Sequence, residues 1–298
     1  MRTFTPGFAL ELATVLAPLR RGPGDPAFRR TDTGVTWLAA NTADGPGTLA
    51  LHRRAGEVVG EAWGPGAGVL LDGIPALVGA DDDDSDFRAH HPLVADLRNR
   101  MPALRLGSTG RVWDPLVASI LEQKVTGIEA HRSWRELCRR FGEPAPGPAP
   151  DRMRVPPTPA AVLAIPDWEW HRAGVDLARR RAIVAAARVA PRLERAASVR
   201  GRAGRDLLRT VPGVGFWTAA EVAQRAWGDA DAVSVGDFHI PSIVGHALLG
   251  RKLDDAGMLD VLRPYAPHRH RVVRYLEAAG STRPRFGPRL SPRDYRAI

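Results

Sequence analysis

The segment from Leu208 to Ala219 constrains the fold of this chain more than any other, and it reads Leu-Arg-Thr-Val-Pro-Gly-Val-Gly-Phe-Trp-Thr-Ala. A Pro-Gly-Val-Gly turn between two apolar segments predicts two helices joined by a tight connection. Gly213 and Gly215 allow the backbone to adopt positive φ and to approach a ligand closely. A turn that opens a helix presents unpaired N–H groups, which suit a phosphate. The segment therefore predicts a helix, a turn and a helix with an anion site at the turn.

A carboxylate follows the second of these helices, in the segment Val-Gly-Asp-Phe-His-Ile that ends at Ile240. Asp237 stands where the next helical pattern starts, so it can act as a helix cap. Asp229 and Asp231 are rival carboxylates, but their Gly-Asp-Ala-Asp setting is typical of solvated turn residues. Asp237 is the carboxylate that we expect to carry chemistry.

The charge of the chain indicates a polyanionic partner. The 298 residues carry a formal net charge of +9, and the sequence pI is about 10.8. Such an excess of positive charge is typical of nucleic-acid binding. A GC-rich genome explains why the cations are nearly all arginine, with Lys124 and Lys252 as the exceptions, but it does not explain the excess over acidic residues.

The single cysteine and the absence of long apolar segments exclude several classes of protein. With Cys138 alone, the chain can form no internal disulfide, no cysteine-ligated zinc site and no iron–sulfur cluster. No apolar signal stretch and no segment of membrane-spanning length is found. We expect a cytoplasmic protein that requires no cofactor.

The chain divides into three parts by its patterns. Residues 1–88 predict an α+β N-terminal domain, with a short helix in residues 6–19 and strands at 35–42, 48–53 and 57–63. The acidic run at residues 81–84 indicates a solvated loop or a domain junction. Residues 89–281 predict a mostly α-helical domain that contains the hairpin. Residues 282–298 form a basic, Pro-rich tail that either touches DNA or is a flexible end.

The turn, the small-residue helix after it and Asp237 together resemble the helix-hairpin-helix superfamily of DNA glycosylases, the base-excision repair enzymes. The resemblance implies that DNA phosphates bind at the hairpin, at Gly213, Val214, Gly215 and Thr218. It also implies a monovalent cation, Na or K, held by the main-chain carbonyls of Arg209, Val211 and Val214, and carbonyl oxygens are hard ligands that suit such an ion.

The resemblance implies that Asp237 is catalytic, because a fixed carboxylate stabilises the positive charge that develops on deoxyribose as the N-glycosidic bond breaks. Bifunctional members carry a lysine two residues past the last hairpin glycine, and that lysine forms a Schiff base with the sugar. Trp217 occupies the position here. The implied enzyme is monofunctional, uses water and leaves an abasic site.

Trp217 also matches the alkyl-base branch of the superfamily, DNA-3-methyladenine glycosylase II. Aromatic faces attract the cationic bases that ring methylation creates, and Phe238 matches a second aromatic wall. Glu221 and His268 stand at positions that are aromatic in known relatives, so they depart from the pattern within the base pocket. The implied substrates are 3-methyladenine and 7-methylguanine in double-stranded DNA, bound by a monomer.

The segment Leu-Glu-Gln-Lys-Val-Thr at residues 121–126 matches the base-flipping segment of the superfamily. Flipping a nucleotide out of the duplex costs a few kcal/mol, and a side chain fills the gap. The match places Gln123 beside the lesion and Lys124 at the wedge position, although Lys124 could bind phosphate instead and both could be ordinary helix-end residues. Two other functions remain open: a glycosylase for another damaged base, and a non-catalytic protein that binds DNA damage.

Overall fold

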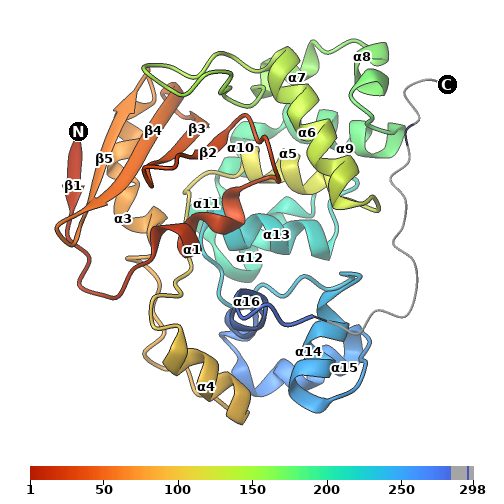
Figure 1. Ribbon diagram of the computed structural model, residues 1–298. Coiled ribbons are helices and arrows are strands. Elements are labelled where there is room, and N and C mark those ends of the chain that lie inside the picture. The colour runs from red at the N-terminus through yellow and green to blue at the C-terminus, as the bar shows by residue number, and fades with distance from the viewer. Residues whose placement is uncertain (283–293, 295–298) are drawn as a thin grey trace.

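A five-stranded antiparallel sheet forms the N-terminal part of the computed structural model, which describes residues 1–282 and Asp294 (Figure 1). The strand order is β1-β5-β4-β3-β2. Strands β4 and β5 are joined through Ala55 and Gly56, which both have positive φ, as a two-residue hairpin requires. The three strands predicted from alternation are confirmed, and the sheet comprises β1 (Arg2–Phe4), β2 (Phe28–Arg30), β3 (Thr36–Thr42), β4 (Gly45–Arg54) and β5 (Glu57–Trp63).

Short helices cover one side of this sheet and bury its apolar side chains. The helix expected in residues 6–19 is shorter than predicted, because α1 spans only Leu12–Leu16 and continues as a 3-10 helix, η1 (Ala17–Leu19). Glu11 caps α1 by accepting the N–H of Ala13. Helix α2 (Ala67–Asp72) packs on β4 and β5, and α3 (Ile74–Leu77) follows it. Leu49, Leu51 and Val58 are fully buried in this core.

The first of two helical cores surrounds α5 (Trp113–Leu121), in which every residue is buried except Asp114, which is partly buried. Helix α5 packs on α6 (Gly127–Phe141), on α9 (Leu177–Arg188) and on α13 (Phe216–Ala226). Thr126 and Glu129 form a reciprocal capping box that starts α6. The remaining helices of this core and its surroundings are α7 (Pro159–Leu163), α8 (Asp167–Arg172), α10 (Ala190–Glu194), α11 (Ala196–Val199) and α12 (Gly201–Leu208).

The second helical core brings together two segments that are far apart in the sequence. Helix α4 (Pro92–Arg100) packs against α16 (Arg269–Ala278), and α16 also contacts α14 (Ile240–Leu249). Helix α15 (Asp255–Leu262) and the 3-10 helix η2 (Arg263–Tyr265) complete this core, which lies at the bottom of Figure 1. The helical part expected as one domain therefore contains two apolar cores.

A buried ion pair ties the acidic run to α16, so the prediction of a solvated loop is wrong for Asp82. Its side chain is 3% exposed and accepts two hydrogen bonds from the guanidinium of Arg271, whose side chain is 1% exposed. The same carboxylate accepts the N–H of Leu106 at 2.9 Å. A buried carboxylate needs such partners because burial alone disfavours its charge.

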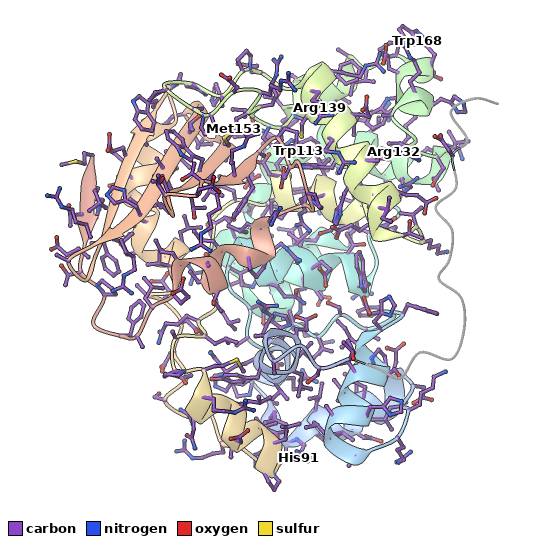
Figure 2. All side chains as sticks on the ribbon, viewed as in Figure 1. His91, Trp113, Arg132, Arg139, Met153 and Trp168 are labelled. Carbon is purple, nitrogen blue, oxygen red and sulfur yellow. The ribbon has the colours of Figure 1, made fainter. Side chains whose placement is uncertain are left out.

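The sheet is attached to α5 through polar contacts. The side-chain amide of Asn41 on β3 donates to Oδ1 of Asp114 at 2.9 Å, and its backbone N–H donates to Oδ2. The indole of Trp113 donates to the carbonyl of Pro157. Figure 2 shows Trp113 at this junction and Trp168 at the outer end of α8. Among the described residues, no helix is both long and apolar enough to cross a membrane. The arginines of the predicted basic tail lie outside the described residues.

Candidate active site between the hairpin and Asp237

The predicted pair of helices is present as α12 and α13, joined by a turn over residues 209–215. The N–H of Val214 donates to the carbonyl of Val211 at 3.0 Å and closes the turn. Gly213 has a φ of +88°, and a Cβ built on it would lie 2.8 Å from Cβ of Ala182 on α9. The turn therefore requires glycine at position 213 for internal reasons, both steric and conformational.

Gly215 differs from Gly213 because no contact within residues 1–282 requires its small size. It is the N-cap of α13, its φ is −94°, and a Cβ built on it meets no atom within 4 Å. Among the residues that the structure describes, no side-chain hydrogen bond caps this helix end. The first N–H groups are therefore open at the end of a helix that carries a partial positive charge there. The structure thus leaves open space in front of a ready anion site.

Asp237 lies between α13 and α14 and is held from both sides. Its Oδ1 accepts the N–H groups of His239 and Ile240 at 2.7 and 2.9 Å, at the start of α14. Its Oδ2 accepts the indole Nε1–H of Trp217 at 3.0 Å. The N-cap of α14 is His239, so Asp237 is not the N-cap itself, although its Oδ1 binds the N–H groups at the start of that helix. Its Oδ2 faces the half-buried indole of α13.

The predicted flipping segment contacts the hairpin directly. The side-chain amide of Gln123 donates to the carbonyl of Gly213 at 2.9 Å and to Oγ1 of Thr218 at 2.8 Å. The carbonyl of Leu121, where α5 ends, accepts a hydrogen bond from the buried guanidinium of Arg179. These bonds place the segment beside the turn, which the sequence alone could not establish.

Lys124 is exposed and has a φ of +53°. A left-handed conformation costs a residue other than glycine roughly 1–2 kcal/mol, so the surrounding bonds must maintain it. Glu122 on one side pairs with Arg21 at 2.9 Å, and Thr126 on the other is part of the capping box of α6. The lysine therefore projects from a segment that is fixed before and after it.

Glu221, which stands at a position that is aromatic in known relatives, has several polar partners in the structure. It is 9% exposed, accepts the hydroxyl hydrogen of Ser234 on Oε1, and pairs with Arg225 through Oε2 at 2.8 Å. The guanidinium of Arg225 reaches the carbonyl of Pro18 in turn. This ion pair joins α13 to the N-terminal part of the chain, and sequence analysis missed it because Pro18 and Ser234 carry no motif.

The two remaining residues predicted for a base pocket lie in different environments. Phe238 is 68% exposed, and its ring packs edge-on against His239 with centroids 5.0 Å apart. His268 is 5% exposed, and its ring contacts Asp86, Arg271 and Phe87 in the second helical core. The structure brings Trp217 and Asp237 together, and it gives His268 structural partners of its own.

The rival carboxylates Asp229 and Asp231 are not the solvated turn residues that the sequence predicted. Asp229 is 9% exposed, pairs with Arg205 and accepts the indole N–H of Trp227 at 3.1 Å. Asp231 accepts two hydrogen bonds from the guanidinium of Arg269 at 2.8 and 2.6 Å. The loop wraps around arginines that are distant in sequence, so local composition could not reveal this burial.

Side chains and main-chain carbonyls are the two kinds of group that could hold a metal ion at this site. No group of three or more His, Cys, Asp or Glu side chains that could hold a metal ion occurs in residues 1–282 and 294. The carbonyl of Val211 already accepts the N–H of Val214 but retains a second lone pair. The residues predicted to hold a monovalent cation, Arg209, Val211 and Val214, all lie in or beside the turn. Arg209 also places its guanidinium 3.5 Å from the centroid of the exposed Phe216 ring.

The site combines an anion-binding helix end, a projecting lysine and a fixed carboxylate. The uncapped N-terminus of α13 can receive an anion, and Lys124 projects from the neighbouring segment. Asp237, held by Trp217, can stabilise a developing positive charge or orient a water molecule. An anion site next to a fixed carboxylate suits a substrate that carries phosphates and reacts through a cation.

Comparisons with solved structures identify the fold. The 3-methyladenine DNA glycosylase from Archaeoglobus fulgidus matches with a TM-score of 0.77 and 15% identity, covering 93% of this chain and 97% of that one. MBOgg1 in complex with a low-affinity DNA ligand matches with a TM-score of 0.73 and 16% identity, over 94% and 100% of the two chains.

A third solved structure is the Clostridium acetobutylicum 8-oxoguanine glycosylase/lyase in complex with double-stranded DNA containing cytosine opposite 8-oxoguanine. It matches with a TM-score of 0.71 and 11% identity, over 93% of this chain and 96% of that one. No family model matches the sequence, and no curated protein matches it. The chain therefore has the fold of DNA glycosylases that act on different damaged bases.

Proposed function

We propose that this chain, which has the DNA glycosylase fold, is a monofunctional DNA glycosylase that removes alkylated purines from double-stranded DNA as a helix-hairpin-helix enzyme. The observation that carries the proposal is the pairing of Asp237 with Trp217 beside the uncapped N-terminus of α13. This pairing puts a fixed carboxylate and an aromatic ring next to the place where a DNA phosphate would bind.

DNA would bind through the hairpin. The backbone N–H groups at Gly213, Gly215 and Thr218 would hold phosphates, while Val214, whose own N–H closes the turn, would keep the turn in shape. The open space in front of Gly215 would let the DNA backbone approach closely. A monovalent cation on the carbonyls of Arg209, Val211 and Val214 would reinforce the phosphate contact electrostatically. The net charge of +9 supports association with a polyanion.

Base removal would proceed by hydrolysis. Lys124 would enter the duplex as the nucleotide leaves the stack, and Gln123 would lie beside the lesion. As the N-glycosidic bond lengthens, positive charge grows on the deoxyribose and the base departs with the bonding electrons. The carboxylate of Asp237 would stabilise that charge and orient the water that adds to the sugar, leaving an abasic site.

The absence of a lysine in the hairpin supports the monofunctional proposal. Trp217 stands where a Schiff-base lysine would be needed, and the two lysines of the chain are Lys124 and Lys252. We expect wild-type protein to leave strands intact until alkali is added. Trapping with borohydride should capture no covalent protein–DNA adduct, and a captured adduct would contradict a water-based mechanism.

Alkylated purines, 3-methyladenine and 7-methylguanine, are the substrates that Trp217 favours, because an indole face attracts a cationic base. The buried ion pair of Glu221 and Arg225 favours a second candidate, a glycosylase for another damaged base. That pair supplies a polar surface where an aromatic wall would otherwise stand.

Base release from methylated double-stranded DNA tests the proposal. Wild-type protein should release methylpurines, which chromatography identifies. Asp237→Asn should lower the release rate at least about a hundredfold while DNA affinity stays nearly unchanged, because the carboxylate acts on the transition state. Asp260→Asn, at an exposed aspartate that pairs with Arg263 on the surface, is the matched control and should behave like wild type. Full activity of Asp237→Asn would overturn the assignment.

A further inference from the structure

Residues 18–25, which we call the N-terminal tether, lead from η1 toward β2 and contact the helical part of the chain. In Figure 1 they belong to the red stretch between α1 and β2, which extends from the sheet to the helices. The backbone N–H of Arg21 donates to Oδ2 of Asp25 at 2.7 Å, which closes the tether into a turn. Oδ1 of Asp25 accepts the indole N–H of Trp134 on α6 at 2.8 Å. The tether is therefore attached to the helix that follows the predicted flipping segment.

The backbone of the tether also packs directly on α6. Gly22 has a φ of +73°, and a Cβ built on it would overlap the ring of His131. The carbonyl of Pro23 accepts a hydrogen bond from the guanidinium of Arg135 at 3.2 Å. Only glycine allows this approach at position 22, so the sequence and the packing agree that the tether is fixed on α6.

A buried ion pair joins the tether to the flipping segment itself. The guanidinium of Arg21, whose side chain is 7% exposed, donates to Oε1 of Glu122 at 2.9 Å. Glu122 directly precedes Gln123, which binds the hairpin, and Lys124, whose φ is +53°. A buried guanidinium keeps its charge and needs a carboxylate partner, so this contact fixes the start of the segment.

A second ion pair ties the tether to α13. The guanidinium of Arg225 donates to the carbonyl of Pro18 at 2.9 Å and pairs with Glu221 at 2.8 Å. Burial lowers the pKa of Arg21, and the charges of Arg225 and Glu221 also act on its guanidinium, so the two ion pairs lie close enough to form one network. The tether thus contacts both the flipping segment and the helix that carries Trp217.

We propose that the N-terminal tether positions the flipping segment, and that Arg21 is the residue through which the sheet domain keeps Lys124 in its projecting conformation. The inference rests on the proposed glycosylase function and adds to it a positioning role for the N-terminal domain. A left-handed backbone at a residue other than glycine persists only where the surrounding structure fixes it. Arg21 fixes one side of Lys124 through Glu122, and the capping box at Thr126 fixes the other.

Such prior ordering favours base flipping. A side chain that is already in place when DNA binds loses little conformational entropy as it fills the gap left by the extruded nucleotide. Loosening the segment should therefore slow flipping most where extrusion costs most, in a fully paired duplex. A general loss of activity would instead slow the reaction on every DNA by the same factor.

Single-turnover base release from two double-stranded DNAs tests the role of Arg21. Both DNAs carry 7-methylguanine, opposite cytosine in one and opposite thymine in the other, and the mismatched nucleotide flips at lower cost. Arg21→Met should slow release from the paired DNA about tenfold and from the mismatched DNA about twofold. Arg21→Lys keeps the positive charge but loses the planar fork, so it should recover part of the rate on paired DNA.

Two further variants separate positioning from a structural effect. In the Lys124→Gly background, Arg21→Met should change the ratio of the two rates no further, because Arg21 acts through that side chain. Arg140→Met is the matched control, since Arg140 lies near the C-terminal end of α6 and pairs with the buried Glu169 at 2.7 Å. It removes a comparable ion pair from α6 and should leave the ratio of the two rates as in wild type.

Hydrogen exchange of the backbone amides at residues 122–125 tests the tether without chemistry. Arg21→Met should speed exchange there at least about fivefold, and Arg140→Met should not. Thermal unfolding shows whether each variant is folded, and if Arg21→Met is not, Glu122→Gln takes its place in both measurements.

The possible failures lead to different conclusions. Unchanged exchange at residues 122–125, or equal slowing of base release on both DNAs, would overturn the positioning role of Arg21. A ratio that shifts as much in the Lys124→Gly background as in wild type would overturn the action through Lys124. Wild-type protein that releases no base from any damaged DNA would overturn the proposed function instead, and the exchange measurement would still decide whether the tether holds the segment.

Discussion

The indole of Trp217 donates a hydrogen bond of 3.0 Å to Oδ2 of Asp237. Because Oδ1 of the same carboxylate accepts two backbone N–H groups at the start of α14, both oxygens have fixed directions. Trp217 was predicted as an aromatic wall, and the structure adds that it orients the carboxylate. One side chain thus links the hairpin to the residue proposed for catalysis.

Trp217→Phe tests the hydrogen bond apart from the ring. The variant keeps an aromatic face but lacks the Nε1–H, and a hydrogen bond of this kind contributes about 1 kcal/mol. We expect the single-turnover rate of base release to fall roughly fivefold. DNA affinity should change little, which a binding titration on abasic DNA would show. An unchanged rate would mean that the bond does not orient the carboxylate.

The two hairpin glycines should respond differently to substitution. Gly215→Val places a side chain in open space, so thermal stability should stay near that of wild type while DNA affinity falls at least about tenfold. Gly213→Ala forces a Cβ against Ala182 at positive φ and should lower the free energy of unfolding by about 1–3 kcal/mol. Wild-type affinity in folded Gly215→Val would contradict phosphate binding at this turn.

Lys124→Gly should raise the free energy of unfolding and slow base release. Glycine adopts positive φ without strain, so the variant should gain about 1 kcal/mol in the free energy of unfolding. Loss of the projecting side chain should slow base release from paired DNA more than from a mismatched lesion, which flips at lower cost. Denaturant unfolding and single-turnover kinetics measure the two effects, and equal slowing on both DNAs would argue against a wedge.

Asp114 should make the attachment of the sheet depend on pH. Burial raises the pKa of Asp114 from 3.8 to about 6. Between these values the folded state keeps a proton that the unfolded state has released, so the stabilisation from this group is present below about pH 4 and lost as pH rises past 6. Urea unfolding from pH 4 to 7 should show the stability of wild type relative to Asp114→Asn decreasing across this range. A constant difference would rule out this titration.

The parts of the fold that depend on local pattern were predictable. Strands β3, β4 and β5 follow alternation and turn residues, and the helix from Gly127 to Phe141 follows its apolar period. The hairpin and Asp237 were found because turn glycines and a carboxylate at a helix start have local signatures. The contact between Gln123 and the turn had no such signature, since it joins segments that are 90 residues apart.

Charged residues were the hardest to interpret from sequence. Asp82, Asp229 and Asp231 lie in polar segments that suggest solvent, yet each binds an arginine from another part of the chain. Asp82 and Arg271 are separated by 189 residues. Burial of a charge depends on a partner that only the tertiary fold supplies, so composition within a window cannot reveal it.

The second helical core is built from residues 87–104 and 233–276, so it can form only late during synthesis of the protein. While α14 to α16 are still inside the ribosome, the apolar face of α4 has no native surface to pack against. Asp237 lies just after the point where the first core ends and the second resumes. A nascent chain can therefore complete its sheet and its first core early, but Asp237, the carboxylate proposed for catalysis, reaches its final position only after α16 has emerged and closed on α4.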